Sequence, residues 1–151
     1  MPDPNVHIPA SGGSYILWLK LNRKRRISVG RLGEHLFQPG FYAYTGSAFG
    51  PGGLKARLGH HLKKSERPHW HIDYLKNIAT VREIWFSDEP QNLEHLWSNA
   101  LSQMPNARIP VIAFGSSDCV CPTHLLFFAE QPAFDLFQKP ATETSISRLI
   151  P

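Results

Sequence analysis

The sequence predicts a single α+β domain: a small, central, mainly antiparallel β-sheet flanked by helices, with an inserted basic β-hairpin. Its 151 residues leave room for one domain with a sizeable core. Short stretches rich in aromatic and branched residues are interspersed with segments of helical periodicity. Strands and helices do not follow the regular alternation typical of a parallel sheet, which favours α+β.

The first part of the chain predicts three strands. We expect residues 1–12, which are rich in proline, to form a flexible N-terminal tail. Residues 15–21 are aromatic and branched, and a basic turn ends this stretch. Residues 26–30 alternate polar and apolar side chains, and residues 41–45 follow a Pro-Gly pair. We expect all three strands to share one antiparallel sheet.

A glycine-rich loop at residues 46–53 precedes a short basic helix. Leu54, Leu58 and Leu62 recur there at helical spacing. The loop lacks the Gly-Lys-Ser/Thr ending of a P-loop, which argues against nucleotide hydrolysis. Residues 69–75 have no clear period, and we interpret them as a helical turn after an extended entry.

The second half begins with a predicted strand over residues 80–86. Residues 90–104 carry apolar side chains at i, i+3, i+4 and i+7, which predicts the longest helix, with Asp88 as its N-cap. Glu94 borders this apolar stripe. There it either binds a hard cation such as Mg²⁺ or simply reaches solvent or a nearby arginine.

Two further strands complete the predicted domain, which spans residues 13–140. Residues 108–114 contain a proline and are expected at a sheet edge. Residues 125–128 are the expected final buried strand. We expect residues 141–151 to be a flexible C-terminal tail.

Charge is distributed unevenly along the chain. Residues 1–76 hold 12 Lys/Arg and 4 Asp/Glu, whereas residues 77–151 hold 4 and 8, so a first half of +8 precedes a second half of −4. Such a basic half either binds a polyanion such as nucleic acid or is merely a solvated surface. The candidate nucleic-acid-binding residues are Arg23, Lys24, Arg25, Arg26, Arg31, Lys55, Lys63 and Lys64.

Composition also bears on the expected compartment. No apolar run approaches the ~18 residues of a membrane span, and the first residues lack the pattern of a signal peptide. The chain has two cysteines, Cys119 and Cys121, with His124 close by. Their spacing is not that of a usual zinc site, so we expect no zinc and interpret them as structural. We therefore expect a cytoplasmic protein that contacts no membrane.

The basic helix carries a pairing suited to phosphate. Arg57 precedes His60 and His61 by three and four residues, which places a guanidinium and at least one imidazole on one helix face. Arginine forms a planar fork for phosphate oxygens, and histidine exchanges protons near neutral pH. An ordinary exposed basic helix is the simpler interpretation of the same pattern.

These residues together resemble the GIY-YIG nuclease superfamily, in particular the branch known as domain of unknown function 123. Gly13-Ser14-Tyr15 and Tyr44-Thr45-Gly46 are similar to the two signature tripeptides, although Ser14 and Thr45 replace both isoleucines. Segments 29–33, 46–54, 69–75 and 114–119 are similar to hallmark stretches of the branch. The inserted basic hairpin is longer than the usual link between the tripeptides.

The resemblance implies an endonuclease that hydrolyses phosphodiester bonds of DNA, with branched or damaged DNA among its candidate substrates. It implies a catalytic site of Tyr15, Tyr44, Arg57, His61 and Glu94, with one Mg²⁺ or Mn²⁺ on Glu94. Arg57 would stabilise negative charge, a tyrosine would orient or deprotonate water, and His61 would relay the proton. The alternatives are a non-catalytic nucleic-acid-binding module, or an adaptor that keeps the fold after its site has decayed.

Overall fold

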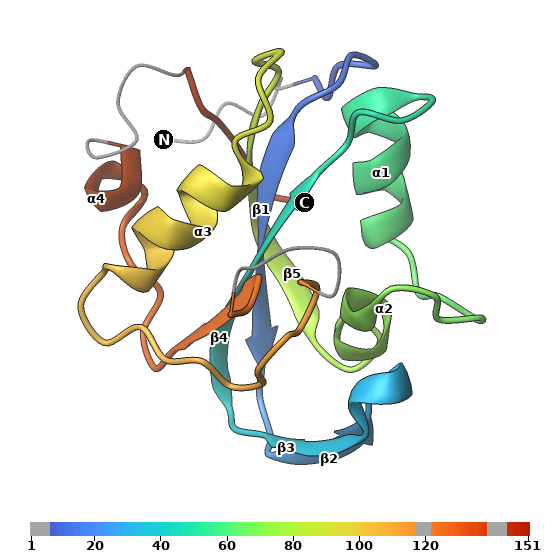
Figure 1. Ribbon diagram of the computed structural model, residues 1–151, viewed down its shortest axis with the longest axis vertical. Helices are drawn as coiled ribbons and strands as arrows, with labels where there is room; N and C mark the ends of the chain where they lie inside the picture. Colours follow the sequence, from blue (N-terminus) through green and yellow to red (C-terminus); the bar gives the residue numbers. More distant parts are fainter. Residues whose placement is uncertain (1–6, 117–121, 139–144) are drawn as a thin grey trace.

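A five-stranded antiparallel sheet forms the centre of the molecule, with strand order β6-β4-β1-β5-β7 (Figure 1). The computed structural model describes residues 7–116, 122–138 and 145–151. The strands are β1 (Ser14–Leu21), β4 (Gly40–Ser47), β5 (Thr80–Ser87), β6 (Leu125–Phe128) and β7 (Ser147–Leu149). The predicted α+β class and antiparallel sheet are confirmed.

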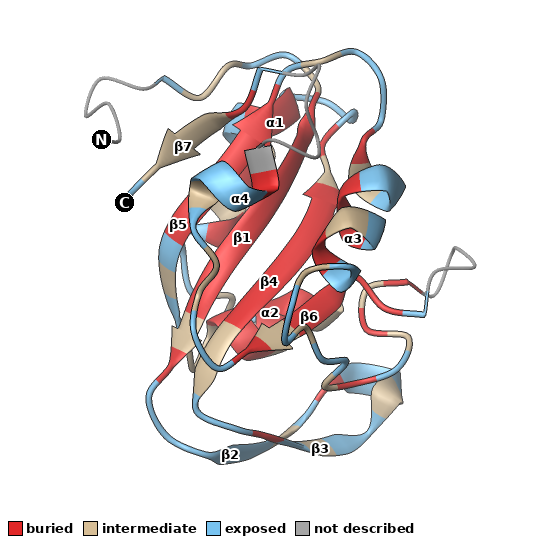
Figure 2. Cartoon of the chain, turned by 90° about the vertical axis from the view of Figure 1, so that its left-hand side faces the viewer, coloured by how far each residue is buried: buried red, intermediate tan, exposed pale blue. Residues whose placement is uncertain are grey.

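Helices cover both faces of this sheet, so the central strand β1 is buried on both sides (Figure 2). Successive side chains of a strand point to opposite faces. Tyr15, Leu17 and Leu19 pack in the same core as side chains of α1 (Gly53–His61) and α2 (His71–Lys76). Ile16 and Trp18 pack in the core of α3 (Glu94–Ser102) and α4 (Phe134–Gln138). The near-continuous apolar run of β1 is therefore explained by burial on two faces.

The inserted hairpin forms its own small sheet from β2 (Arg25–Ser28) and β3 (Glu34–Phe37), joined by the 3₁₀ helix η1 (Gly30–Leu32). The prediction that the second strand joins the central sheet is wrong, because β1 pairs directly with β4. Val29 and Phe37 are fully buried and attach the hairpin to the core. The rest of the hairpin is largely exposed (Figure 2).

The longest predicted helix begins later than expected. It starts at Glu94 rather than near residue 90, and Leu93 rather than Asp88 occupies the N-cap position. The reason is tertiary: the Leu93 side chain is buried, and its N–H donates a hydrogen bond of 2.8 Å to Ser14 Oγ on β1. The residues between β5 and Leu93 therefore form a connection that brings Leu93 to Ser14 on β1, and the helix begins only after it.

Residues 108–114 do not form the predicted strand. Only Arg108 makes a bridge, to Phe127, and the segment then turns through Ala113, whose φ is +67°. Pro110 has no backbone N–H to donate, which prevents further pairing. The segment instead runs beside β6 and the residues that precede it, hydrogen-bonded through Arg108 to Phe127 and through Phe114 to His124.

Both predicted tails are partly wrong. Ser147–Leu149 form β7, which pairs with β5, and so belong to the sheet. At the other end, the carbonyl groups of Pro9 and Ser11 accept hydrogen bonds from the first turn of α1. The strand over residues 80–86, the basic helix and the helical turn after an extended Trp70 are confirmed. In the part of the chain that the structure describes, no helix is long and apolar enough to cross a membrane.

Candidate functional site

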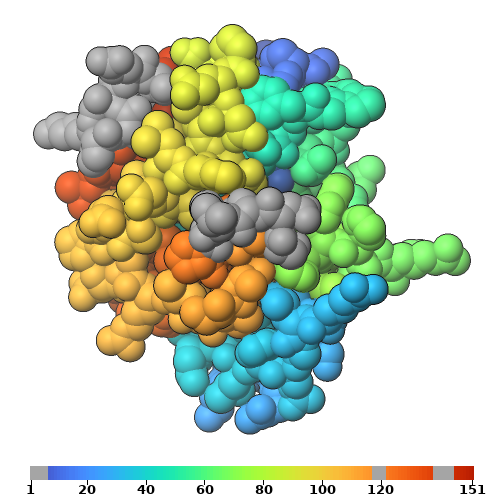
Figure 3. Space-filling view, in the orientation of Figure 1, coloured from blue at the N-terminus to red at the C-terminus, as the bar shows by residue number. Residues whose placement is uncertain are grey.

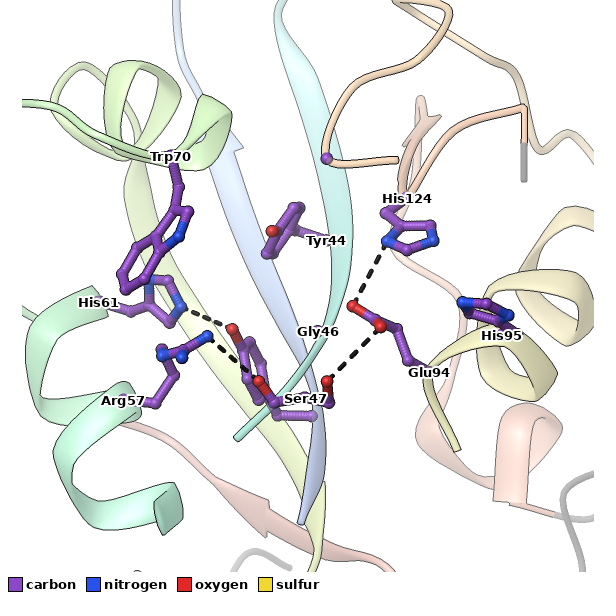
Figure 4. Close-up of a pocket in the computed structure, with 11 residues that line it drawn as sticks. Tyr44, Gly46, Ser47, Arg57, His61, Trp70, Glu94, His95 and His124 are labelled. Carbon is purple, nitrogen blue, oxygen red and sulfur yellow. Dashed lines mark hydrogen bonds and ion pairs between the residues drawn. The ribbon is translucent and has the colours of Figure 1, made fainter. Parts of the chain in front are cut away.

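A cavity of about 280 Å³ opens between α1 and α3, where β1 begins and β4 ends. Pairing of β4 with β6 stops at Tyr44, and the Thr45 N–H makes one further hydrogen bond to the His124 carbonyl. Gly46 and Ser47 therefore have β1 on one side and this cavity on the other. Arg57, His61 and Trp70 reach the cavity from one side, and Glu94 and His124 reach it from the other (Figure 4). Its lining residues are Tyr15, Tyr44, Gly46, Ser47, Arg57, His61, Trp70, Glu94, His95, Gly115 and His124. All five residues predicted to be catalytic are therefore brought together.

The two tyrosines reach the cavity because of the register between β1 and β4. Tyr15 lies opposite Gly46, and Leu17 lies opposite Tyr44, so both tyrosines share the α1 face of the sheet. The ring of Tyr15 lies across Gly46, where a Cβ atom would collide with the Tyr15 hydroxyl. Glycine at this position is thus required by the position of Tyr15.

His61 is buried between the two tyrosines and is held in its neutral form. Its Nε2 hydrogen-bonds to the Tyr15 hydroxyl at 2.8 Å. Burial lowers the pKa of His61 to about 3, and the positive charges of Lys76, His60 and Arg57 act in the same direction. Nδ1 of His61 has no hydrogen-bond partner among the described residues.

Both tyrosines are held as phenols. Burial raises the pKa of Tyr15 far above its ordinary value, although the nearby Arg57 opposes part of this effect. Burial also raises the pKa of Tyr44, and the proximity of Tyr15 and Glu94 adds to it. At neutral pH these hydroxyl groups can therefore donate as well as accept hydrogen bonds.

Arg57 is positioned by two contacts. Its Nη1 donates to the backbone carbonyl of Ser47 at 3.1 Å, and its guanidinium carbon lies 4.4 Å from the centre of the Trp70 ring. Such stacking holds a guanidinium in place while leaving other N–H groups available. Arg57 is half-buried at the cavity wall and can donate to an anion within it.

A polar cluster around the buried carboxylate of Asp73 holds the backbone at Trp70. Asp73 accepts hydrogen bonds from the backbone N–H groups of His69 and Trp70 and from His60 Nε2, and it pairs with Lys76 at 3.3 Å. Burial alone would raise the pKa of Asp73, but these donors lower it to about 2. His60, His61 and Asp73 could approach a metal ion. Lys76 already neutralises the carboxylate, so we assign the cluster a structural role.

Glu94 is brought to the cavity from a distant part of the chain. The hydrogen bond from Leu93 to Ser14 fixes the start of α3 directly beside Tyr15. Ser47 Oγ donates to Glu94 Oε2 at 3.5 Å, and an acidic residue in the first helical turn is favoured by the helix dipole. The Glu94 side chain is 19% exposed, so its carboxylate remains accessible from the cavity.

The carboxylate of Glu94 is suited to a divalent cation. Mg²⁺ and Mn²⁺ prefer oxygen ligands, and Mg²⁺ commonly takes one or two protein carboxylates while keeping water or substrate oxygens. His124 lies on the far side of the carboxylate, with Nδ1 3.4 Å from Glu94 Oε1. The polar cavity beside Glu94 leaves room for water and phosphate oxygens.

Sequence reasoning missed four side chains that line the cavity: Ser47, Trp70, His95 and His124. Ser47 has no chemical signature of its own. Trp70 and His124 belong to the segments 69–75 and 118–124, which the sequence singles out for other reasons. His71, in the first of these segments, accepts a hydrogen bond from the Gly115 N–H, which explains it as packing. Cys119 and Cys121 lie outside the described residues.

The predicted nucleic-acid-binding residues are all exposed. They are Arg23, Lys24, Arg25, Arg26, Arg31, Lys55, Lys63 and Lys64. Those before residue 32 lie on or beside the hairpin at the lower end of the molecule, and Lys63 and Lys64 lie in the connection between α1 and α2, which projects on the right (Figure 3). Arg26 pairs with Glu34 at 3.5 Å, so its charge is partly balanced.

The fold and cavity define a small α+β protein with a pocket suited to phosphate chemistry, in which tyrosine, arginine, histidine and glutamate side chains converge. Residues 14–145 match the model of a protein family described as domain of unknown function DUF123. The chain belongs to this family. No curated protein and no solved structure gave a significant match to the chain.

Proposed function

We propose that this protein is a divalent-metal-dependent endonuclease of the GIY-YIG type that hydrolyses phosphodiester bonds of DNA. The observation that carries the proposal is the convergence of Glu94 with Arg57 and Tyr15 on one cavity, although they come from three different parts of the chain. A packing role alone does not require a carboxylate, a guanidinium and a phenol to face the same polar space. Phosphodiester hydrolysis needs groups of these kinds together.

Arg57 is the proposed phosphate ligand. A guanidinium donates to two phosphate oxygens at once and keeps its charge at every physiological pH. Trp70 and the Ser47 carbonyl hold it before the substrate arrives, so little ordering is needed on binding. Arg57 thereby stabilises the negative charge that develops on the phosphate in the transition state.

Tyr15 and His61 are the proposed pair for the attacking water. With its proton directed to Nε2 of His61, the Tyr15 oxygen can accept a hydrogen bond from water. The raised pKa of Tyr15 keeps it a phenol in the free protein, which favours orientation of the water over prior removal of its proton. The lowered pKa of His61 keeps its Nε2 unprotonated in the free protein. As the water attacks, Tyr15 would pass its own proton to Nε2 of His61 and take the proton of the water in its place. The ring of Tyr44 packs edge-on against His61.

Glu94 is the proposed ligand of a divalent cation, Mg²⁺ or Mn²⁺. When bound, the cation would neutralise charge on the scissile phosphate and on the leaving oxygen. The accessible carboxylate and the polar cavity next to it support this role.

The hairpin is the proposed second contact with DNA. β1 runs from Tyr15 to the start of the hairpin after Leu21, a span of about 20 Å at about 3.3 Å per residue. Along duplex DNA this corresponds to about six base pairs. Arg23, Lys24 and Arg25 would then contact the backbone at a distance from the bond that is cut.

The exposed hairpin also favours the second candidate function, a nucleic-acid-binding module without catalysis. Its charges would bind the DNA backbone whether or not the cavity is active. The two functions differ in what they require of Glu94, because backbone binding gains nothing from a carboxylate near phosphate.

Cleavage and binding measured in parallel test the proposal. Nicked, branched, damaged and single-stranded DNA are incubated with Mg²⁺ or Mn²⁺ and with wild type, Glu94→Gln, Arg57→Ala or the control Glu130→Gln, which removes an exposed carboxylate outside the cavity. We expect wild type and Glu130→Gln to cleave, Glu94→Gln to bind without cleaving, and Arg57→Ala to lose cleavage and bind more weakly. Binding by wild type without cleavage of any substrate would favour the binding module.

A further inference from the structure

His124 is rigidly held beside the carboxylate of Glu94. It immediately precedes β6, its backbone N–H donates to the carbonyl of Phe114 at 2.8 Å, and its carbonyl accepts from the N–H of Thr45 at 3.0 Å. Its side chain is 3% exposed. The backbone of His124 is therefore fixed by two neighbouring segments, and burial restricts the movement of its imidazole, which points toward Glu94 (Figure 4).

The distance between the two side chains is close to the spacing of two ligands on one metal ion. His124 Nδ1 lies 3.4 Å from Glu94 Oε1. This exceeds the ~2.7–3.2 Å of ordinary N–H···O hydrogen bonds. Donor atoms bound to one ion at about 2.1 Å are separated by about 3.0 Å in the octahedral geometry of Mg²⁺ and Mn²⁺, so a shift of about 0.4 Å would place both donors on one ion.

The two oxygens of Glu94 have separate neighbours. Oε1 faces His124, whereas Oε2 accepts a hydrogen bond of 3.5 Å from Ser47. The contact with Ser47 is as long as the contact with His124, so the direction of the carboxylate is set by the position of Glu94 in the first turn of α3. Oε1 and the imidazole nitrogen therefore form an ordered pair of donors at the cavity wall.

We propose that His124 and Glu94 together hold the divalent cation, and that the site consequently prefers Mn²⁺ to Mg²⁺. Mg²⁺ favours oxygen ligands, whereas an imidazole nitrogen is a good ligand for first-row transition metals. The inference rests on the proposed function only in taking this cavity as the place where the cation acts. It assigns His124 a second ligand position next to Glu94.

Mn²⁺ binding to the full-length protein tests this pair without any cleavage assay. Electron paramagnetic resonance titrates free Mn²⁺ against wild type, His124→Asn and the control His35→Gln, which removes a histidine on the hairpin. Mg²⁺ is added as competitor. Electron spin-echo envelope modulation of bound Mn²⁺ then reports whether a ¹⁴N nucleus is coordinated, and this measurement on wild type needs no variant to fold. Circular dichroism checks that each variant is folded.

We expect one Mn²⁺ per chain, ¹⁴N modulation in wild type, and Mg²⁺ displacing Mn²⁺ only at a concentration at least about 10-fold higher. His124→Asn should weaken Mn²⁺ binding at least about 10-fold, the lower end of the loss seen when even an outer-shell partner is removed. His35→Gln should bind as wild type does.

The outcomes separate this inference from the proposed function. Bound Mn²⁺ without ¹⁴N modulation, or unchanged affinity in folded His124→Asn, overturns the His124 ligand even if DNA is cleaved. Coordinated ¹⁴N that is lost in His124→Asn supports the ligand pair even if no DNA is cleaved, and in that case the nuclease proposal alone fails.

Discussion

Acidification should destabilise this protein through His61. The imidazole is 2% exposed, and its pKa falls from 6.5 to about 3, chiefly by burial. Between these two values the unfolded chain binds a proton that the folded chain does not. Stability contributed by the neutral form is therefore present above pH 6.5 and decreases as the pH falls toward about 3.

The size of this effect follows from the shift. One pKa unit corresponds to about 1.36 kcal/mol. Lowering the pH from 7 to 5 should therefore lower the free energy of unfolding by about 2 kcal/mol through His61 alone. His61→Gln removes the titrating group. Between pH 7 and pH 5 its free energy of unfolding should therefore fall by about 2 kcal/mol less than that of wild type. Tyr15→Phe removes the hydrogen bond to His61 but leaves the ring buried, and it should keep the wild-type pH dependence.

Urea unfolding at pH 7 and pH 5 measures the free energy of unfolding of all three proteins. The quantity compared is the change between the two pH values, so any constant cost of a substitution cancels. Equal changes for wild type and His61→Gln would show that folding does not lower the pKa of His61, which would refute the imidazole held neutral by burial beside Tyr15.

Three further substitutions test separate parts of the structure. Neutralising residues 23–26 should lower the salt slope of DNA binding by up to about 3–4, measured by titration at several salt concentrations; an unchanged slope would mean that the hairpin is only solvated. Asp73→Asn should lower the free energy of unfolding at neutral pH by about 3 kcal/mol because it leaves Lys76 buried without its counter-ion. Because the pKa of Asp73 is lowered from 3.8 to about 2, its stabilisation is present above pH 3.8 and lost as the pH falls through 2, which urea unfolding across this range would check. Gly46→Ala should cost about 1–3 kcal/mol by displacing the Tyr15 ring, and an unchanged melting temperature would contradict the close contact.

Local sequence patterns predict the parts of the fold that depend on near neighbours. The apolar run of β1 and the helical spacing of Leu54 and Leu58 in α1 are such signals. β7 has no such signal, because three residues show no period and the strand forms only where the edge of β5 accepts it. Likewise, α3 begins at Glu94 because Leu93 bonds to Ser14, which is 79 residues away in the chain.

In the candidate site too, some features can be predicted from local sequence and others depend on long-range contacts. The spacing of Arg57 and His61 and the stripe-edge position of Glu94 can be recognised in the sequence. Their meeting on one cavity depends on β6 beginning opposite Tyr44, which no single segment encodes. His124 illustrates the difference: its nearness to two cysteines suggests a zinc ligand, whereas its fixed contact in the structure is with Glu94.

The central claim is that the two sides of the cavity act on one phosphate. A double-mutant cycle on the single-turnover cleavage rate tests it most directly, with wild type, Arg57→Ala, Glu94→Gln and the double variant each in saturating excess over DNA and with saturating Mn²⁺. Groups that act together in one transition state are strongly non-additive. We predict that each single variant lowers the single-turnover rate by about 10²–10³-fold, to a value still measurable above the uncatalysed background, and that the double variant is no slower than the slower single variant. A near-wild-type rate in either single variant, or losses that simply multiply in the double variant, would contradict a shared site.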